Sequence, residues 1–407
     1  MAFAATAPTP PHVPPSLVRD VDAFALPGAE EDVQLAWRKV QQECPDVFWT
    51  PRNGGHWIAT RAEDIEIIQA DHTRFSFRRI IIPDIGRPFP VYPLDLDPPD
   101  HAPYRLMISP AFSPAMVARL GERVREVAVE AIESFRLKGE CEFVQDFAKV
   151  LPIVLFLEMV DLPREDAAIL LPLAEKVARS ANPDDVTAAR LALADYVKVW
   201  IDRREREPGG DLLSHIIHYR VGGERMPPEA ILGTCSNLLA AGLDTVAAML
   251  GFAARFLADN PGHRRQLADD PSLIPTAVEE LIRRHGVANM GRLITHDFTF
   301  KGAALKAGEM IQIPNCLYGL DERRVERPLE VDFRRGKVDH AAFGNGPHRC
   351  PGAILARREL ATFLTEFLGR IPEFSIAEGT KPQMSSGLIN GMQRLDLSWD
   401  PATTRAL

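Results

Sequence analysis

The sequence predicts a mainly helical protein with a small β region, built around one long central helix. Apolar residues recur at helical spacing over most of the chain, and these stretches do not alternate with strands as a doubly wound sheet would require. The 34 prolines predict that many helices end abruptly. One segment, Pro228–Asp259, contains no proline after its first residue, so it predicts a helix much longer than the others.

The remaining elements follow from spacing and from the Pro, Gly and Asn residues between them. The other predicted helices are Pro98–Phe112, Pro114–Phe135, Leu162–Val177, Asp184–Glu205, Asp211–Tyr219 and Ala353–Gly369. Short β-like runs are rarer: Val47–Thr50, His56–Thr60, Arg292–Thr295, Met310–Ile313 and Leu395–Trp399.

The central segment begins at Pro227-Pro228, which suits a first helical turn, and Asn260-Pro261 ends it. At about 1.5 Å per residue it is roughly 48 Å long, enough to cross a domain. It is apolar on most faces, so we expect it to be buried. A buried central helix is well placed to cover a cofactor.

The composition, with 46% hydrophobic and 25% charged residues, is that of a globular protein. A formal charge of −9 argues against a nucleic-acid partner. The cysteines are widely spaced without a CxxC pair, so we expect no structural zinc or iron–sulfur site and a reducing, cytoplasmic location. No uninterrupted apolar run reaches about 18 residues, and no membrane association is predicted.

The N-terminal residues are rich in proline and have neither a basic start nor a long apolar core. This pattern predicts a disordered or extended tail over residues 1–16, not a targeting segment. We find no repeat or long linker after it, so residues 17–407 are expected to form a single, monomeric domain.

The strongest chemical signal is the decapeptide Phe343–Gly352, a glycine-rich loop that delivers Cys350 just before a predicted helix. Glycines allow tight turns and close approach to a flat ligand. The helix N-terminus favours a thiolate at this position. A thiolate on haem iron promotes O–O cleavage. The alternative is a loop cysteine packed as a small hydrophobic residue, which is our interpretation of the other four.

This decapeptide resembles the haem-binding loop of the cytochrome P-450 superfamily. Two further signatures follow the family's order, since Glu280–Arg283 resembles its ExxR pair and Ala240–Thr245 its oxygen-binding stretch. In detail the chain is similar to the bacterial camphor-hydroxylase family, through Gly242–Val246, Gly319–Arg323 and Leu355–Glu359. The resemblance implies the P-450 fold, with the long helix over a buried haem b (iron protoporphyrin IX), and haem-thiolate monooxygenase activity with Cys350 as the iron ligand.

Glu280 and Arg283 lie three residues apart, hence on one helical face. Alone, this spacing also fits a surface ion pair of little energetic value. The resemblance implies a buried pair that braces the cysteine loop.

Asp244 and Thr245 are polar residues near the middle of the apolar central helix, where a carboxylate is costly unless it is paired or used. The threonine hydroxyl can bond to the carbonyl one turn back and loosen the helix. The resemblance assigns the two residues to proton delivery during oxygen activation. The alternative is a structural hydrogen bond. Ala241 stands where camphor-type members often have glycine.

The resemblance also implies which residues bind the cofactor. His101, Arg105, Arg292 and His348 would contact the haem propionates, since arginine binds carboxylates bidentately. Phe343, Gly344, Cys350 and Gly352 would form the loop below the ring. The alternative for any single cation is a solvated surface residue. Met290 replaces an aspartate that camphor-type members often place near a propionate.

The substrate pocket is predicted from the resemblance. Camphor-type members place a tyrosine eight residues before the Asp of Asp-Pro-Pro, and here Phe89 stands there, with Tyr92 three residues off register. We therefore expect a terpenoid-like substrate of the norisoprenoid (ionone) type, with camphor disfavoured. Asn237 is polar on a buried helix, and a helix–helix hydrogen bond is the alternative to substrate contact. The further candidates are Ala240, Ala241, Ala288, Leu388 and Ile389.

The chain is too short for a fused reductase, so the resemblance implies electrons from a [2Fe–2S] ferredoxin and a flavin-dependent reductase, with O2 as co-substrate. Candidate docking cations are Arg105, Lys337, Arg349 and Arg357. Two alternatives stay open. One is a peroxide-driven peroxygenase, a class that usually lacks an acidic residue and a threonine at the positions of Asp244 and Thr245. The other is a haem-thiolate sensor, which should carry an output domain. A bacterial, cytoplasmic enzyme is expected.

Overall fold

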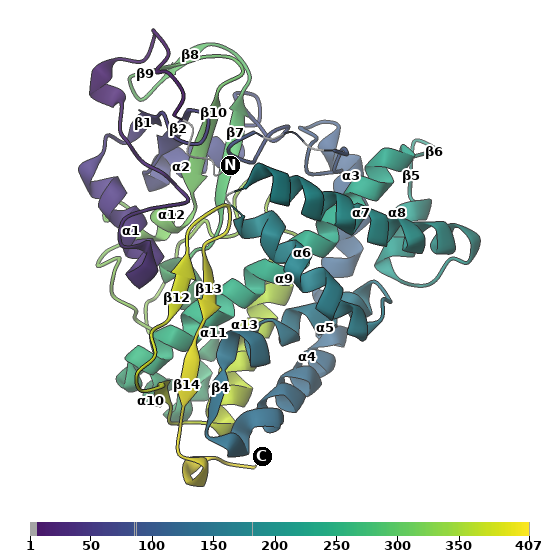
Figure 1. Cartoon of the computed structure of the whole chain (residues 1–407), viewed down its shortest axis with the longest axis vertical. Coiled ribbons are helices and arrows are strands. Elements are labelled where there is room, and N and C mark those ends of the chain that lie inside the picture. The colour runs from purple at the N-terminus through teal and green to yellow at the C-terminus, as the bar shows by residue number, and fades with distance from the viewer. Residues whose placement is uncertain (1–5, 85, 87, 181, 407) are drawn as a thin grey trace.

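The computed structural model describes residues 6–84, 86, 88–180 and 182–406. The helices occupy most of the molecule, and the largest sheet lies to one side, at the upper left of Figure 1. The predicted class, mainly helical with a smaller β region, is therefore confirmed.

The helices are α1 (Ala29–Glu43), α2 (Ala62–Ala70), α3 (His101–Ile108), α4 (Pro114–Phe135), α5 (Val150–Met159), α6 (Ala167–Arg179), α7 (Pro183–Arg206), α8 (Leu212–His218), α9 (Pro228–Asp259), α10 (Pro261–Asp269), α11 (Ile274–Arg284), α12 (Cys316–Leu320) and α13 (Ala353–Arg370). Capping side chains mark where two of these helices start. Ser113 accepts a hydrogen bond from the Met116 amide at 3.3 Å to cap α4, and Asn182 caps α7 in the same way.

The strands are β1 (Val47–Thr50), β2 (His56–Ala59), β3 (Phe75–Ser76), β4 (Glu140–Glu142), β5 (Arg220–Val221), β6 (Glu224–Arg225), β7 (Asn289–Ile294), β8 (Phe298–Phe300), β9 (Ala303–Leu305), β10 (Met310–Pro314), β11 (Ser375–Ile376), β12 (Gln383–Ser385), β13 (Gly391–Arg394) and β14 (Asp396–Ser398). The five-stranded sheet has the order β1-β2-β10-β7-β3, in which only the β2–β10 pair is parallel. A three-stranded sheet has the order β11-β14-β4, and the other strands pair in twos.

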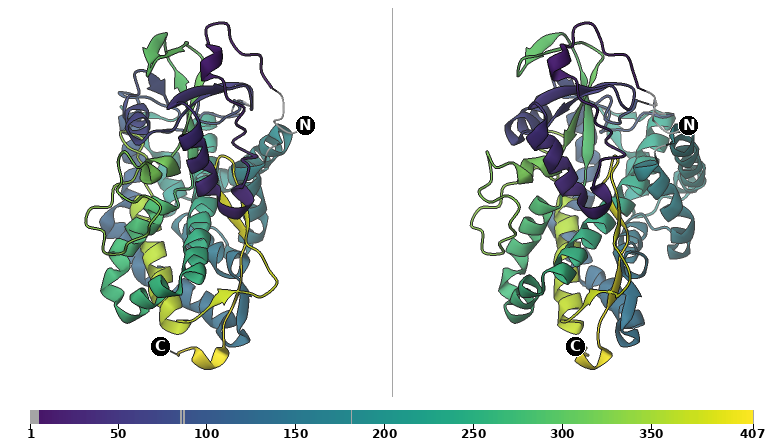
Figure 2. Two further views of the ribbon diagram at one scale, coloured as in Figure 1. Left: turned by 90° about the vertical axis from the view of Figure 1, so that its left-hand side faces the viewer. Right: turned by 60° about the vertical axis from the view of Figure 1, so that its left-hand side comes forward.

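The long helix α9 runs through the middle of the molecule, as Figures 1 and 2 show, and contacts α5, α6, α7 and α13. It begins at Pro228 and ends before Asn260, with the predicted bounds. Among the described residues it is the one helix long and apolar enough to cross a membrane by length and composition. Protein elements pack around it, which explains the apolar composition.

Several elements differ from the predicted ones. The stretch Pro98–Phe112 is divided: α3 starts at His101, and residues 109–112 form a 3-10 turn because Pro110 cannot continue the α-helical hydrogen bonds. The predicted helix Leu162–Val177 also begins later than expected, since α6 starts only at Ala167, after Pro163. The sequence did not predict α1, α2, α5, α10 and α12, and α5 is apolar on nearly all faces, so periodicity gives little signal there.

The described part of the N-terminal segment contacts the sheet region, which fits an extended tail and not a disordered one. The Ala7 amide donates to the Pro51 carbonyl at 2.8 Å, Val13 is buried and His12 contacts Glu309 at 3.0 Å. The prolines discourage local hydrogen bonding, but the sheet region supplies partners from elsewhere in the chain. Residues 1–5 lie outside the described residues, and the division at residue 17 stays a proposal.

Candidate active site

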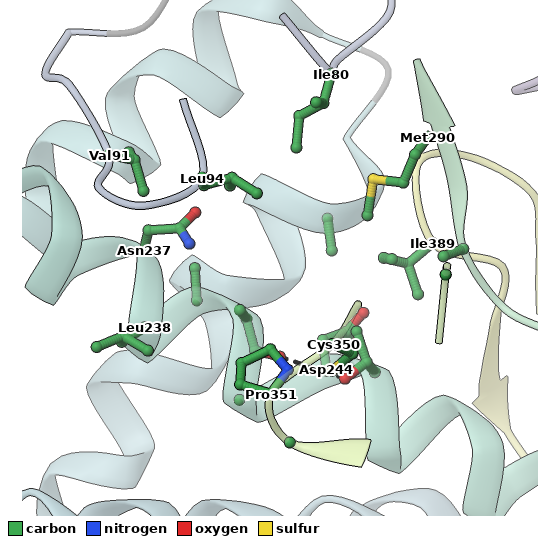
Figure 3. A pocket seen from close by; sticks show the side chains of 18 of the residues that line it. Ile80, Val91, Leu94, Asn237, Leu238, Asp244, Met290, Cys350, Pro351 and Ile389 are labelled. Carbon is green, nitrogen blue, oxygen red and sulfur yellow. Dashed lines mark hydrogen bonds between the residues drawn. The ribbon is translucent and has the colours of Figure 1, made fainter. Parts of the chain in front are cut away.

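A cavity of about 460 Å³ lies between α9 and the cysteine loop, and every predicted catalytic, cofactor-binding and substrate-pocket residue lines it. Figure 3 shows its lower end at Cys350 and Pro351, its upper end at Ile80, Val91 and Leu94, and one wall at Asn237 and Leu238 of α9. The roles of these residues stay predictions, but the fold brings together positions up to 300 residues apart, from Phe89 to Ile389.

The cysteine loop presents Cys350 to this cavity. Gly344 and Gly346 both have φ of 72°, a left-handed conformation that glycine adopts without strain, and the Cys350 amide donates to the Phe343 carbonyl at 2.9 Å. Enclosure by protein raises the pKa of the Cys350 thiol, opposed by the Gly352 N–H and by Arg105. The Gly352 N–H, at the start of α13, therefore lowers the pKa of the thiol as predicted, but the effect of burial is larger.

Asp244 is 3% exposed and its Oδ1 lies 2.7 Å from the guanidinium of Arg179, at the end of α6. Its Oδ2 is buried without a partner among the described residues. Burial raises the pKa of Asp244 to about 6, opposed first by Arg179. A second ion pair, between the buried Lys149 and the partly exposed Glu175, contributes to the same electrostatic environment.

Thr245 donates from Oγ1 to the Ala241 carbonyl at 3.3 Å, the backward bond that its position predicted. Gly242, between them, has a packing reason. A Cβ at this position would lie 2.7 Å from Cδ2 of Phe156 in α5, so only glycine lets the two helices approach so closely.

Four donors line another part of the cavity without an acidic partner. His101 Nε2, His348 Nε2 and Arg292 Nε are buried and unpaired among the described residues. The Arg292 guanidinium lies 3.5 Å from the centroid of the Phe77 ring, which also stacks on His348. Burial lowers the pKa of Arg292 to about 9 and that of His348 to about 2. Arg105 donates to the Arg349 carbonyl at 2.7 Å. No acidic side chain in the described part of the chain forms an ion pair with these four donors.

The upper walls of the cavity are mostly apolar. Phe89 and Tyr92 both line it, and Tyr92 packs against Tyr104 at 4.9 Å between ring centroids. The segment lies so close to α9 that a Cβ on Gly233 would be 2.1 Å from the Pro90 carbonyl oxygen. The Asn237 side chain lines the cavity and forms no helix–helix hydrogen bond with any described residue, so substrate contact stays the prediction.

Comparisons with known proteins agree with this arrangement. The family model for cytochrome P450 matches residues 197–393. A probable cytochrome P450 127A1 of Sinorhizobium fredii is 33% identical over 404 residues, covering 97% of each chain. The chain belongs to the cytochrome P450 superfamily.

Two solved structures support the family resemblance at the level of the fold. CYP101J2 is 36% identical, with a TM-score of 0.88, over 97% of this chain and 100% of its own. CYP101C1 has the same identity and TM-score over 96% of this chain and 100% of its own. The recognition of a P450 similar to camphor-type bacterial members is confirmed, and the protein is a monooxygenase.

As a P450 the protein binds haem b, and the cavity fits that group. Haem carries two carboxylates, and the unpaired donors His101, Arg292 and His348 with Arg105 provide the missing complement. Cys350 supplies a sulfur at the lower end of the same cavity. We propose that these residues hold the propionates and the iron, with Phe343, Gly344 and Gly352 in the loop beneath.

The Glu280–Arg283 pair of this P450 is fully buried, with two parallel contacts of 2.8 Å. Its other bonds reach Gly319, Pro328 and Glu330 through the guanidinium, and the Asp332 amide through the carboxylate. The pair was predicted to brace the cysteine loop, but its hydrogen bonds go to the segment that precedes the loop. The neighbouring Glu279 makes the link to α13, through Arg357, and contacts His340 at 3.1 Å.

Sequence reasoning missed several residues of this site. Arg179 pairs with Asp244, and Arg335 contacts Glu280 at 2.9 Å as a second cation. Glu359 lies within a quoted motif but was given no role. It is 2% exposed, lines the cavity and has an unpaired Oε2, and burial raises its pKa to about 8. This carboxyl is therefore protonated at neutral pH and can donate a hydrogen bond into the cavity.

Proposed function

We propose that this P450 hydroxylates a small hydrophobic, terpenoid-like substrate, with an ionone-type norisoprenoid favoured over camphor. The supporting observation is an apolar cavity that has Cys350 at one end and Asp244 and Thr245 in its wall. The bound haem supplies reductive activation of O2 and insertion of one oxygen atom into a C–H bond.

The chain's own residues would contribute positioning and protons. Cys350 donates its sulfur to the iron, and the apolar walls exclude water from the substrate. Asp244 exchanges a proton with solvent when its contact with Arg179 opens. The proton binds at Oδ2, which has no partner among the described residues. The Thr245 hydroxyl, which now donates to the Ala241 carbonyl, passes the proton into the cavity.

Replacement of Asp244 by asparagine should lower turnover about 100-fold, because an amide cannot carry the proton. The wild-type carboxyl is protonated below pH about 6 and ionised above it. If the protonated form delivers the proton, wild-type turnover falls as pH rises above 6, and this dependence disappears in the variant. Steady-state hydroxylation from pH 5 to 8.5 measures both effects.

The control is Asp64→Asn. Asp64 is also buried with a raised pKa, but it pairs with Lys301 outside the cavity. This variant should keep the wild-type pH profile. An Asp244→Asn enzyme with wild-type turnover and pH profile would remove Asp244 from the proton path.

The substrate preference is proposed from Phe89. A phenol at this position adds one hydrogen-bond donor, worth about 1 kcal/mol, so Phe89→Tyr should tighten camphor binding by up to about tenfold. Titration of the ferric protein with camphor and with an ionone, following the haem spin state, measures this. Wild-type protein should respond strongly to the ionone alone.

The control for this titration is Tyr92→Phe, since Tyr92 is the other candidate phenol at the cavity. It should leave the ionone response unchanged. A strong wild-type camphor response that disappears in Tyr92→Phe would show that Tyr92 replaces the missing phenol, and the ionone preference would be wrong.

We also propose that electrons come from a [2Fe–2S] ferredoxin and its flavin-dependent reductase, in the bacterial cytoplasm. Of the four candidate docking cations, Arg105 and Arg357 are engaged with Arg349 and Glu279, whereas Lys337 and Arg349 are exposed. Leu106 (65% exposed) and Ile354 (42%) lie close in sequence to the site residues Arg105 and Cys350 and add apolar area.

The test of the function supplies haem-loaded protein with NADH, reductase, ferredoxin, an ionone and 18O2. Incorporation of one 18O atom into the product, found by mass spectrometry, supports the proposal. Product formed only with hydrogen peroxide would favour the peroxygenase alternative. Unchanged ligand under full electron supply would favour the sensor alternative.

A further inference from the structure

Arg190 of α7 lines the cavity as a cation that neither the haem site nor the proton path uses. It is half-buried, and its one hydrogen bond within the described part of the chain is long, from Nη1 to the Gly86 carbonyl at 3.3 Å. It forms no ion pair with any residue that the structure describes. Burial alone lowers its pKa, and no carboxylate opposes this effect. A desolvated guanidinium without an anion is unfavourable unless a ligand supplies one.

The other charged residues of the cavity are accounted for. Arg105 and Arg292 belong to the group of donors with His101 and His348, and Asp244 is paired with Arg179. Glu359 is held protonated by burial. Arg190 is therefore the remaining cation among the described residues of this cavity, and it comes from a different helix.

The position of Arg190 indicates which part of a ligand it would meet. Its partner Gly86 precedes the segment that continues into Val91 and Leu94, and Figure 3 places these two residues at the upper end of the cavity, opposite Cys350. Asn237, whose amide is unpaired, lies beside them. The far end of the cavity therefore has two polar side chains, Arg190 and Asn237, among mostly apolar ones, and the space between it and Cys350 is lined mainly by apolar residues.

The acidic groups near this end do not neutralise Arg190. A neighbouring cavity shares Ile80, Ile81, Pro88 and Phe89 with the main one, and its acids are Asp84 and Asp95. Asp84 pairs with Arg79 at 3.1 Å. Asp95 accepts the Val91 amide at 2.7 Å.

We propose that Arg190 binds a carboxylate on the substrate, so that the terpenoid-like body points its opposite end toward Cys350. This inference rests on the proposed function and adds a carboxylate to the terpenoid-like body: since an ionone itself is neutral, an amphipathic monocarboxylic acid with a similar body should bind more tightly than the ionone. A planar guanidinium matches a carboxylate with two parallel hydrogen bonds. A dianionic phosphate would leave one buried charge uncompensated beside a single arginine. Asn237 offers a further donor to the same oxygen atoms.

The experiment compares two probes with one carbon skeleton, perillic acid, which is ionised at neutral pH, and perillyl alcohol. Each is titrated into the ferric holoenzyme while the haem spin state is followed. We expect the wild-type protein to bind the acid at least about tenfold more tightly than the alcohol. Arg190→Gln should weaken acid binding roughly 10- to 100-fold and leave alcohol binding within about twofold. Arg190→Lys should retain an intermediate preference, because it keeps the charge without the fork.

The matched control is Lys198→Gln, which removes a positive charge from the exposed face of the same helix. It should change neither affinity. Acid that binds no better than alcohol to the wild-type protein, or not at all, overturns the proposal, as does an equal loss of both probes in Arg190→Gln. Hydroxylation of the alcohol by the wild-type enzyme tests the proposed function separately, since it does not require Arg190. Tight, Arg190-dependent acid binding without turnover of either probe would support this inference and reject the proposed function.

Discussion

Replacement of Cys350 by alanine should abolish hydroxylation, with a loss of roughly 1,000-fold or more in turnover, equivalent to about 4 kcal/mol on the barrier. The reason is that Cys350 is the one cysteine that lines the cavity. Cys235 and Cys316 are buried outside the cavity, so neither can replace it as the ligand. The ratio of haem to protein, the absorption spectrum and product formation are the measurements.

The matched control is Cys44→Ala, since Cys44 is half-buried and lies outside the cavity. It should keep wild-type haem content and turnover. Thermal unfolding of both variants shows whether the fold survives the substitution. A Cys350→Ala protein with the wild-type absorption spectrum and turnover would show that the sulfur is not the iron ligand.

Replacement of Glu280 by alanine should lower the free energy of unfolding by about 3–5 kcal/mol, because it leaves a buried guanidinium without its carboxylate. Arg283 is 1% exposed and Arg335 contacts the same Glu280 oxygen at 2.9 Å, so two cations lose their partner. The Asp332 amide also loses its acceptor. Denaturant unfolding of the holoenzyme, with haem retention as a second signal, measures the effect.

Glu279→Ala is the matched control on the same helix. The Glu279 side chain, which contacts Arg357 and His340, is 30% exposed. Solvent therefore screens the lost ion pairs, and the free energy of unfolding should fall by about 1 kcal/mol or less. Equal destabilisation by the two substitutions would contradict the argument that burial of the Glu280–Arg283 pair sets the magnitude.

The long helix and the cysteine loop could be predicted from the sequence because contiguous residues carry each signal. Pro228 and Asn260 bound α9 through local backbone rules, and the structure has these bounds. The loop around Cys350 requires glycine at Gly344 and Gly346, where φ is positive. Both features depend on neighbours within a few residues, so the pattern was sufficient for the family, the cofactor and the residues expected around it.

The partners of the site residues were decided only by the tertiary structure. Arg179, which pairs with Asp244, and Arg190, which faces the cavity, stand in ordinary amphipathic helices whose sequences resemble solvated ones. The proline-rich N-terminal segment became ordered through a distant carbonyl at Pro51. In each case the energy depends on burial and on a counter-charge or acceptor from remote parts of the chain. Local spacing does not contain information on burial or on the remote partner, because side chains lose their water only when the helices pack.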